Sequence, residues 1–139
     1  MDRKKFILGS LGAAITSFLL GALWHPLLMG DFYTAHMATI LRAEPSIPFI
    51  GLGYLVLGML MAYTYPLGYK GGSAVKEGFR FGALIGLIWI LPLSLMLHGT
   101  INISLVVVLV DAGWHIVQEG LAGIVLAFIY GSGAAATSE

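Results

Sequence analysis

The sequence has no cysteine, which excludes disulfides, thiol catalysis and cysteine-held iron–sulfur clusters. It is also poor in charge, because Asp, Glu, Lys and Arg make up 10% of its 139 residues, against about 25% in a soluble domain. The formal net charge is zero, so we expect no nucleic-acid partner. Hydrophobic residues make up 58%. This composition indicates an integral membrane protein with a single domain over residues 1–139.

Long apolar runs are what the sequence does have. A bilayer core of about 30 Å needs about 20 helical residues, and four segments meet that length: residues 6–29, 47–65, 78–97 and 101–130. The first run is longer than a secretory signal core of about 7–15 residues, so we interpret it as a retained span. The sequence therefore predicts an all-α, polytopic fold with four transmembrane helices. The small, polar tail at 131–139 is expected to be disordered.

Positive charges predict the orientation of these helices. They gather before the first span and around the second link, at Arg3, Lys4, Lys5, Lys70, Lys76 and Arg80. The other two links hold Arg42 alone. We therefore expect a multi-pass protein of the cell inner membrane with both termini in the cytoplasm.

Glycines at helical spacing predict close packing between helices, since small residues let backbones approach in lipid. They form one ridge at Gly78, Gly82 and Gly86, and Gly113 and Gly120 form a second. Such a ridge packs either within one bundle or between subunits. Four short spans enclose little volume, so we expect a homo-oligomer or a larger membrane complex. Pro26 is expected to kink the first helix.

Ionisable residues inside the fourth apolar run mark the candidate site. Asp111, His115, Gln118 and Glu119 share one side of a helix at these spacings, and such groups at membrane depth are functional candidates by default. His25 lies near the outer end of the first span and His98 near that of the third. Trp24 and Trp114 lie beside His25 and His115 in the sequence. We therefore expect a polar pocket in the outer half of the bundle.

Four interpretations of this pocket remain open. Asp111, His115 and His25 would supply ligands for a metal. His25 and His115 on opposing helices would hold a haem. Asp111, His115 and Glu119 step through the membrane as a proton or ion relay would. In the fourth interpretation the polar groups bond to neighbouring helices and fix their register.

Two other pairs are given a structural interpretation. Asp31 and His36, in the link at 30–46, are interpreted as part of a solvated loop rather than a ligand pair. Glu77 and Arg80 have the i, i+3 spacing of a surface salt bridge.

Two short stretches carry a family resemblance: LWHPLLMG at 23–30 and VDAGWH at 110–115. Together they resemble a family of small prokaryotic four-helix integral membrane proteins that is known only as a domain of unknown function. The resemblance implies a four-helix inner-membrane protein and adds weight to Asp111 and His115. It implies no activity.

Three classes of function follow from these features. The first is a small membrane protein whose outer pocket binds or conducts a small solute, a proton or a metal. The second is an accessory or structural subunit packed on a larger membrane protein complex. The third is an enzyme, for which the sequence offers no recognisable nucleophile and no Gly-x-Ser-x-Gly elbow.

Overall fold

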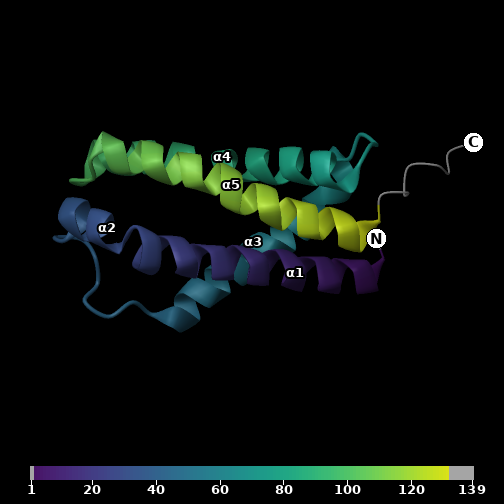
Figure 1. Ribbon diagram of the computed structural model, residues 1–139, viewed down its shortest axis with the longest axis horizontal. Coiled ribbons are helices and arrows are strands. Elements are labelled where there is room, and N and C mark those ends of the chain that lie inside the picture. The colour runs from purple at the N-terminus through teal and green to yellow at the C-terminus, as the bar shows by residue number, and fades with distance from the viewer. Residues whose placement is uncertain (1, 132–139) are drawn as a thin grey trace, which may run out of the picture.

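The computed structural model describes residues 2–131, and the regular structure within them is helical (Figure 1). The expected all-α fold with four apolar helices long enough to cross a membrane is confirmed for this part of the chain. The expectation for the tail at 132–139 lies outside the described residues. The elements are α1 (Arg3–Ala22), which the π-helix η1 (Leu23–Leu28) continues, α2 (Gly30–Met37), α3 (Ile47–Gly68), α4 (Ala74–Thr100) and α5 (Leu105–Tyr130).

Several boundaries differ from the sequence prediction because capping side chains set them. The third span begins at Ala74 rather than 78, since the Ser73 side chain caps α4 by accepting from the Lys76 N–H at 3.3 Å. The fourth begins at Leu105 rather than 101, where Ser104 caps α5 by accepting from the Val107 N–H at 3.3 Å.

The sequence analysis interpreted part of the link at 30–46 as a solvated loop, but the link contains the helix α2. At the start of α2 the Tyr33 N–H donates to the Met29 carbonyl at 3.0 Å. The predicted surface salt bridge between Glu77 and Arg80 is confirmed. Arg80 donates to the Glu77 carboxylate at 2.7 Å in an exposed i, i+3 pair.

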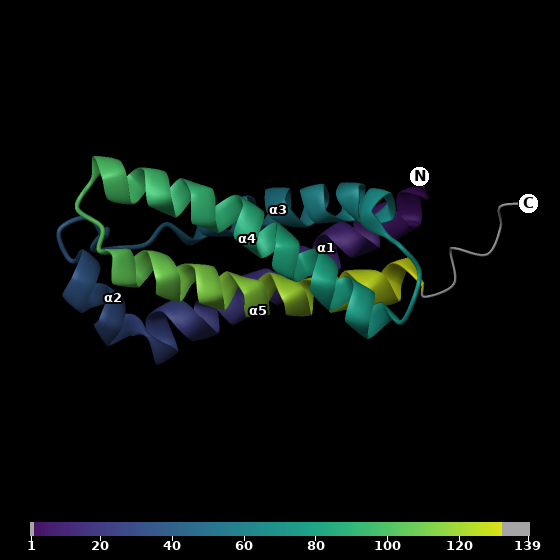
Figure 2. The same ribbon diagram turned by 90° about the horizontal axis from the view of Figure 1, so that it is seen from above.

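The long helices pack in the order α3, α1, α5, α4, so that α1 and α5 form the middle of the bundle (Figures 1 and 2). The start of α1 and the finish of α5 lie together, and the Lys5 ammonium donates to the Tyr130 carbonyl at 2.8 Å. We call this the termini end; the turn from α3 to α4 also lies there. The opposite end holds α2 and the turn from α4 to α5, and we call it the α2 end.

Glycines of α4 let its backbone lie directly on that of α5. A Cβ added at Gly78 would stand 2.5 Å from the Gly123 carbonyl oxygen, and one at Gly82 would overlap the Glu119 carbonyl oxygen. Gly86 meets the His115 carbonyl in the same way. This seam packs two helices of one chain.

The second predicted ridge is divided. On α5, Gly120 packs against the Phe79 ring. Gly113 does not pack as expected, because it is exposed and no atom of a neighbouring element lies within 4 Å of its Cβ position.

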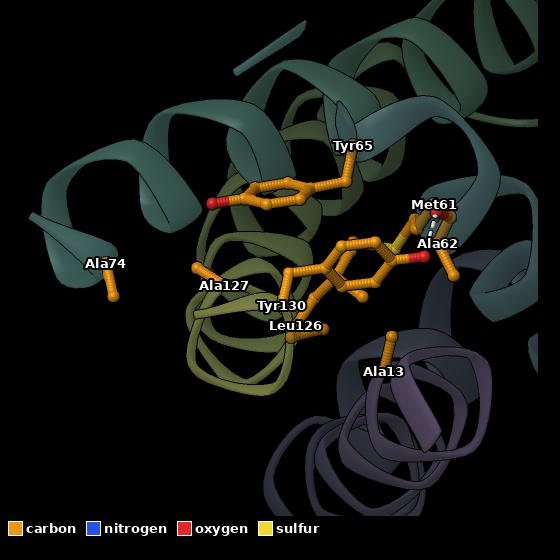
Figure 3. Packing of buried hydrophobic residues seen from close by; sticks show 9 residues of the cluster. Ala13, Met61, Ala62, Tyr65, Ala74, Leu126, Ala127 and Tyr130 are labelled. Carbon is orange, nitrogen blue, oxygen red and sulfur yellow. Dashed lines mark hydrogen bonds between the residues drawn. The ribbon is translucent and has the colours of Figure 1, made fainter. Parts of the chain in front are cut away.

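An apolar cluster fills the termini end of the bundle. Its members come from α1, α3, α4 and α5, and Ala13, Met61 and Leu126 are almost fully buried among them (Figure 3). The Tyr130 hydroxyl donates to the Ala62 carbonyl at 2.7 Å, so its polar atom is satisfied inside the cluster. The polar residues that follow therefore lie in the middle and at the α2 end.

Candidate functional site

Two connected groups of polar side chains make up the candidate site, and α5 contributes to both. Near the α2 end lie His25, Tyr33, Asp111 and His115, which we call the α2-end cluster. In the middle of the bundle lie Ser17, Tyr54, Trp114, Gln118 and Glu119, which we call the mid-bundle network. The one-turn spacing of Asp111 and His115 puts them on the same face of α5, where the His115 Nδ1 faces the Asp111 carbonyl at 2.9 Å.

Glu119 is the centre of the mid-bundle network, and its side chain is fully buried. The Ser17 hydroxyl, from α1, donates to Glu119 Oε2 at 2.7 Å, and the Gln118 amide donates to Glu119 Oε1 at 2.9 Å. The ion pairs found within residues 2–131 do not involve Glu119. Neutral donors therefore satisfy both carboxyl oxygens.

The orientation of the Gln118 amide follows from Trp114, since an indole N–H can only donate. Trp114 Nε1 donates to Gln118 Oε1 at 2.5 Å, which leaves the amide nitrogen to donate to Glu119 and, at 3.3 Å, to the Tyr54 hydroxyl of α3. No buried side-chain nitrogen or oxygen in the described residues lacks a partner. The network thus fixes α1, α3 and α5 against one another.

The π-helical turn η1 brings two aromatic side chains to α5. Pro26 lies inside this turn, and such turns are frequent at functional sites. The Trp24 ring stacks on the Trp114 ring, with centroids 4.2 Å apart and planes 4° from parallel. Trp24 Nε1 also donates to the Tyr33 hydroxyl at 3.1 Å. The Trp24–Trp114 stack therefore joins the mid-bundle network to the α2-end cluster.

Asp111 is the charged centre of the α2-end cluster. The Tyr33 hydroxyl of α2 donates to its Oδ1, and the His25 Nε2 lies 3.9 Å from the same oxygen. Burial raises the pKa of the Tyr33 hydroxyl, and the hydrogen bond to Asp111 raises it further, so this donor keeps its proton. The Asp111 side chain is 18% exposed and that of His25 is 37% exposed, so both remain partly accessible.

His115 completes this cluster from the buried side. The centroid of its ring lies 5.2 Å from that of the Trp89 ring of α4 and 6.2 Å from that of the His25 ring, and both contacts are edge to face. The His25 ring in turn lies 5.0 Å from the Tyr33 ring. The two imidazoles therefore stand in a row of ring contacts that runs from Tyr33 of α2 to Trp89 of α4.

The structure brings together seven of the residues that the sequence analysis singled out: His25, Asp111, His115, Gln118, Glu119, Trp24 and Trp114. His98 is not among them. Its Nδ1 faces the Ile103 carbonyl at 2.6 Å, where it holds the turn from α4 to α5. The expected third imidazole therefore has a structural place in this turn.

The sequence analysis did not single out Tyr33, Tyr54 or Ser17. Tyr33 lay in a link interpreted as solvated, and a buried aromatic hydroxyl there has no periodic signal. Tyr54 and Ser17 lie in apolar spans, where a hydroxyl group at membrane depth was the available signal.

A metal centre receives no support from the geometry of residues 2–131, in which no group of three or more His, Asp or Glu side chains is arranged to hold an ion. An apolar groove between α1 and α3 lies apart from the polar residues. It is lined by Leu11, Ala14, Ile15, Phe18, Leu19, Gly51 and Leu55.

Comparison with known proteins places the chain in a family without giving it an activity. No curated protein and no solved structure gives a match. The family described as "Protein of unknown function (DUF1761)" matches residues 8–127, which is most of the chain. The resemblance carried by residues 23–30 and 110–115 is thereby confirmed at the level of a domain of unknown function, and the chain belongs to the DUF1761 family.

Proposed function

We propose that this protein is a multi-pass inner-membrane protein that binds a small polar solute at its α2-end cluster. The observation that carries the proposal is the convergence of His25, Tyr33 and His115 on Asp111, a carboxylate that is partly exposed at one end of an apolar bundle. Ionisable groups within membrane helices are costly, and they mark ligand or ion sites.

The positive charges support an orientation with this site on the outer side. The chain start, with Arg3, Lys4 and Lys5, and the turn between α3 and α4, with Lys70 and Lys76, lie at the termini end (Figure 1). The positive-inside rule puts that end in the cytoplasm. A solute would then reach Asp111 from outside the cell membrane.

Binding fits the geometry better than conduction through the membrane. The α2-end cluster and the mid-bundle network extend from the α2 end as far as Ser17 and Glu119 in the middle of the bundle. Beyond them, toward the termini end, the apolar cluster around Met61 and Leu126 is closely packed. A relay would need titratable groups or water on that side as well.

The test is a thermal-shift screen of the purified protein against small cationic, neutral and anionic solutes. A solute that binds the folded state stabilises it by mass action. We expect at least one solute class to raise the unfolding temperature of the wild type and of Asp31→Asn, but not of Asp111→Asn. Asp31 is the matched control because it is an exposed carboxylate on α2 at the same end. Equal responses in all three proteins, or none, would refute the proposed site.

A packing role in a homo-oligomer or a larger membrane complex is a second candidate. The groove between α1 and α3 favours it, since Gly51 in its lining has no neighbouring atom within 4 Å of its Cβ position, and small residues let another helix approach. Native mass spectrometry of protein extracted gently from its own membranes tests this role. A fixed ratio to other subunits supports it, and a monomer contradicts it.

A further inference from the structure

We infer that the α2-end cluster binds a small primary ammonium ion, held by hydrogen bonds to Asp111 and His25, with the His115 ring beside His25. The inference rests on the proposed function and names the chemical class of the solute.

Hydrogen-bond geometry places the ring proton of both imidazoles on Nδ1. The His25 Nδ1 faces the Gly21 carbonyl at 3.1 Å, and the His115 Nδ1 faces the Asp111 carbonyl at 2.9 Å. A carbonyl oxygen only accepts, so each Nδ1 carries the ring proton. In a neutral imidazole the Nε2 then holds a lone pair. Each ring is therefore left with one free acceptor.

Asp111 adds a carboxylate acceptor beside the His25 Nε2. Tyr33 uses one lone pair of Oδ1, and an ionised carboxylate offers about four. The His25 Nε2 stands 3.9 Å from Oδ1, which is too long for a hydrogen bond. A donor nitrogen about 2.9 Å from each of the two acceptors, standing to one side of the line that joins them, would bridge them.

The surroundings favour a cation over a neutral donor. Among residues 2–131, the ion pairs found leave Asp111 with His25 alone and no Lys or Arg partner.

A primary ammonium fits this environment because it supplies a positive charge together with N–H donors for Asp111 and the His25 Nε2. A tetraalkylammonium ion supplies the charge without the donors. An anion would meet the Asp111 carboxylate and the lone pair of the His25 Nε2.

The experiment is isothermal titration of the full-length protein in detergent micelles with methylammonium chloride. Tetramethylammonium chloride and sodium chloride serve as cation controls at equal ionic strength, and methanol and sodium formate represent neutral and anionic solutes. A hydrogen bond to a charged group contributes about 1.5–3 kcal/mol, so Asp111→Asn should weaken methylammonium binding by about tenfold or more. Asp31→Asn should bind methylammonium as the wild type does.

A second variant keeps the test independent of the folding of Asp111→Asn. His25→Phe keeps an aromatic ring at a partly exposed position but removes the Nε2 acceptor. It should weaken methylammonium binding severalfold and leave the unfolding temperature of the free protein close to that of the wild type.

The outcomes separate the inference from the proposed function. Saturable binding of methylammonium, weakened in both variants and absent for tetramethylammonium, supports both. Equal binding of tetramethylammonium or sodium overturns the role of the N–H donors. Asp111-dependent binding of methanol or formate alone overturns the ammonium inference but keeps the proposed function. No binding of any of these solutes overturns the inference, and failure of the wider thermal-shift screen as well overturns the proposed function.

Discussion

Replacing Gly82 with alanine should open the α4–α5 seam and destabilise the protein. The new methyl group would overlap the Glu119 carbonyl oxygen and stand 3.0 Å from the Gly120 Cα. Both are helix backbone atoms, so neither can turn aside as a side chain would. Overpacking a core costs about 1–3 kcal/mol, and the better helix propensity of alanine offsets up to about 1 kcal/mol. Because both contacts are to backbone atoms, we take the upper end of that cost, so after the offset we expect Gly82→Ala to lower the free energy of unfolding by about 2 kcal/mol.

Gly113→Ala is the matched control, because it makes the same substitution on the partner helix at an exposed position with no neighbouring atom within 4 Å. There only helix propensity acts, and the variant should gain about 0.5–1 kcal/mol. Reversible unfolding by sodium dodecyl sulfate in mixed micelles, followed through the fluorescence of the chain's three tryptophans, measures both variants. A Gly82→Ala protein as stable as the wild type, or a Gly113→Ala protein as damaged as Gly82→Ala, would refute this account of the seam.

Three further predictions concern single hydroxyl groups. Tyr33→Phe removes the hydrogen bond to Asp111, and a hydrogen bond to a charged group contributes about 1.5–3 kcal/mol. The amide hydrogens of α2 should therefore exchange with solvent about tenfold faster or more, and unchanged exchange would contradict the contact. Burial raises the pKa of Tyr33, so its hydrogen bond to Asp111 persists below pH about 10 and is lost only as the pH climbs toward the raised pKa. Absorbance at pH about 10 should therefore show the same tyrosinate signal in Tyr33→Phe as in the wild type. A smaller signal in the variant would argue against burial of Tyr33. Ser17→Ala leaves the buried Glu119 Oε2 without a donor and should lower the free energy of unfolding in detergent by about 1–3 kcal/mol. Ser10→Ala, which removes a hydrogen bond to the Phe6 carbonyl of its own helix, should lower it clearly less. Equal losses in the two variants would contradict a stabilising role for the mid-bundle network.

The sequence predicts the candidate site where one helix carries it. Asp111, His115, Gln118 and Glu119 share a face of α5 because helical spacing alone decides this. The partners on other elements depend on tertiary structure. Tyr33 reaches Asp111 only because the link after η1 folds into α2, and Tyr54 reaches Gln118 only through the packing of α3 on α1.

The glycines of the seam show the same limit. Gly82 and Gly113 both stand at helical spacing from other glycines, yet one lies on the α5 backbone and the other is exposed. Which face of a helix in lipid meets its neighbour depends on the rotation of that helix, and an apolar face looks alike to lipid and to protein. His98 was expected in the polar pocket with His25 and His115, but its Nδ1 faces the Ile103 carbonyl in the turn between α4 and α5.

Nitrogen-15 NMR of histidine-labelled protein tests the central claim most directly. All four imidazoles have Nδ1 facing a backbone carbonyl, so the neutral form of each should show a protonated Nδ1 and an unprotonated Nε2. On addition of methylammonium chloride, the Nε2 signal of His25 should move as it accepts a hydrogen bond, while those of His36 and His98 stay in place. Signals that all stay in place, or that all move together, would contradict an ammonium site at Asp111 and His25.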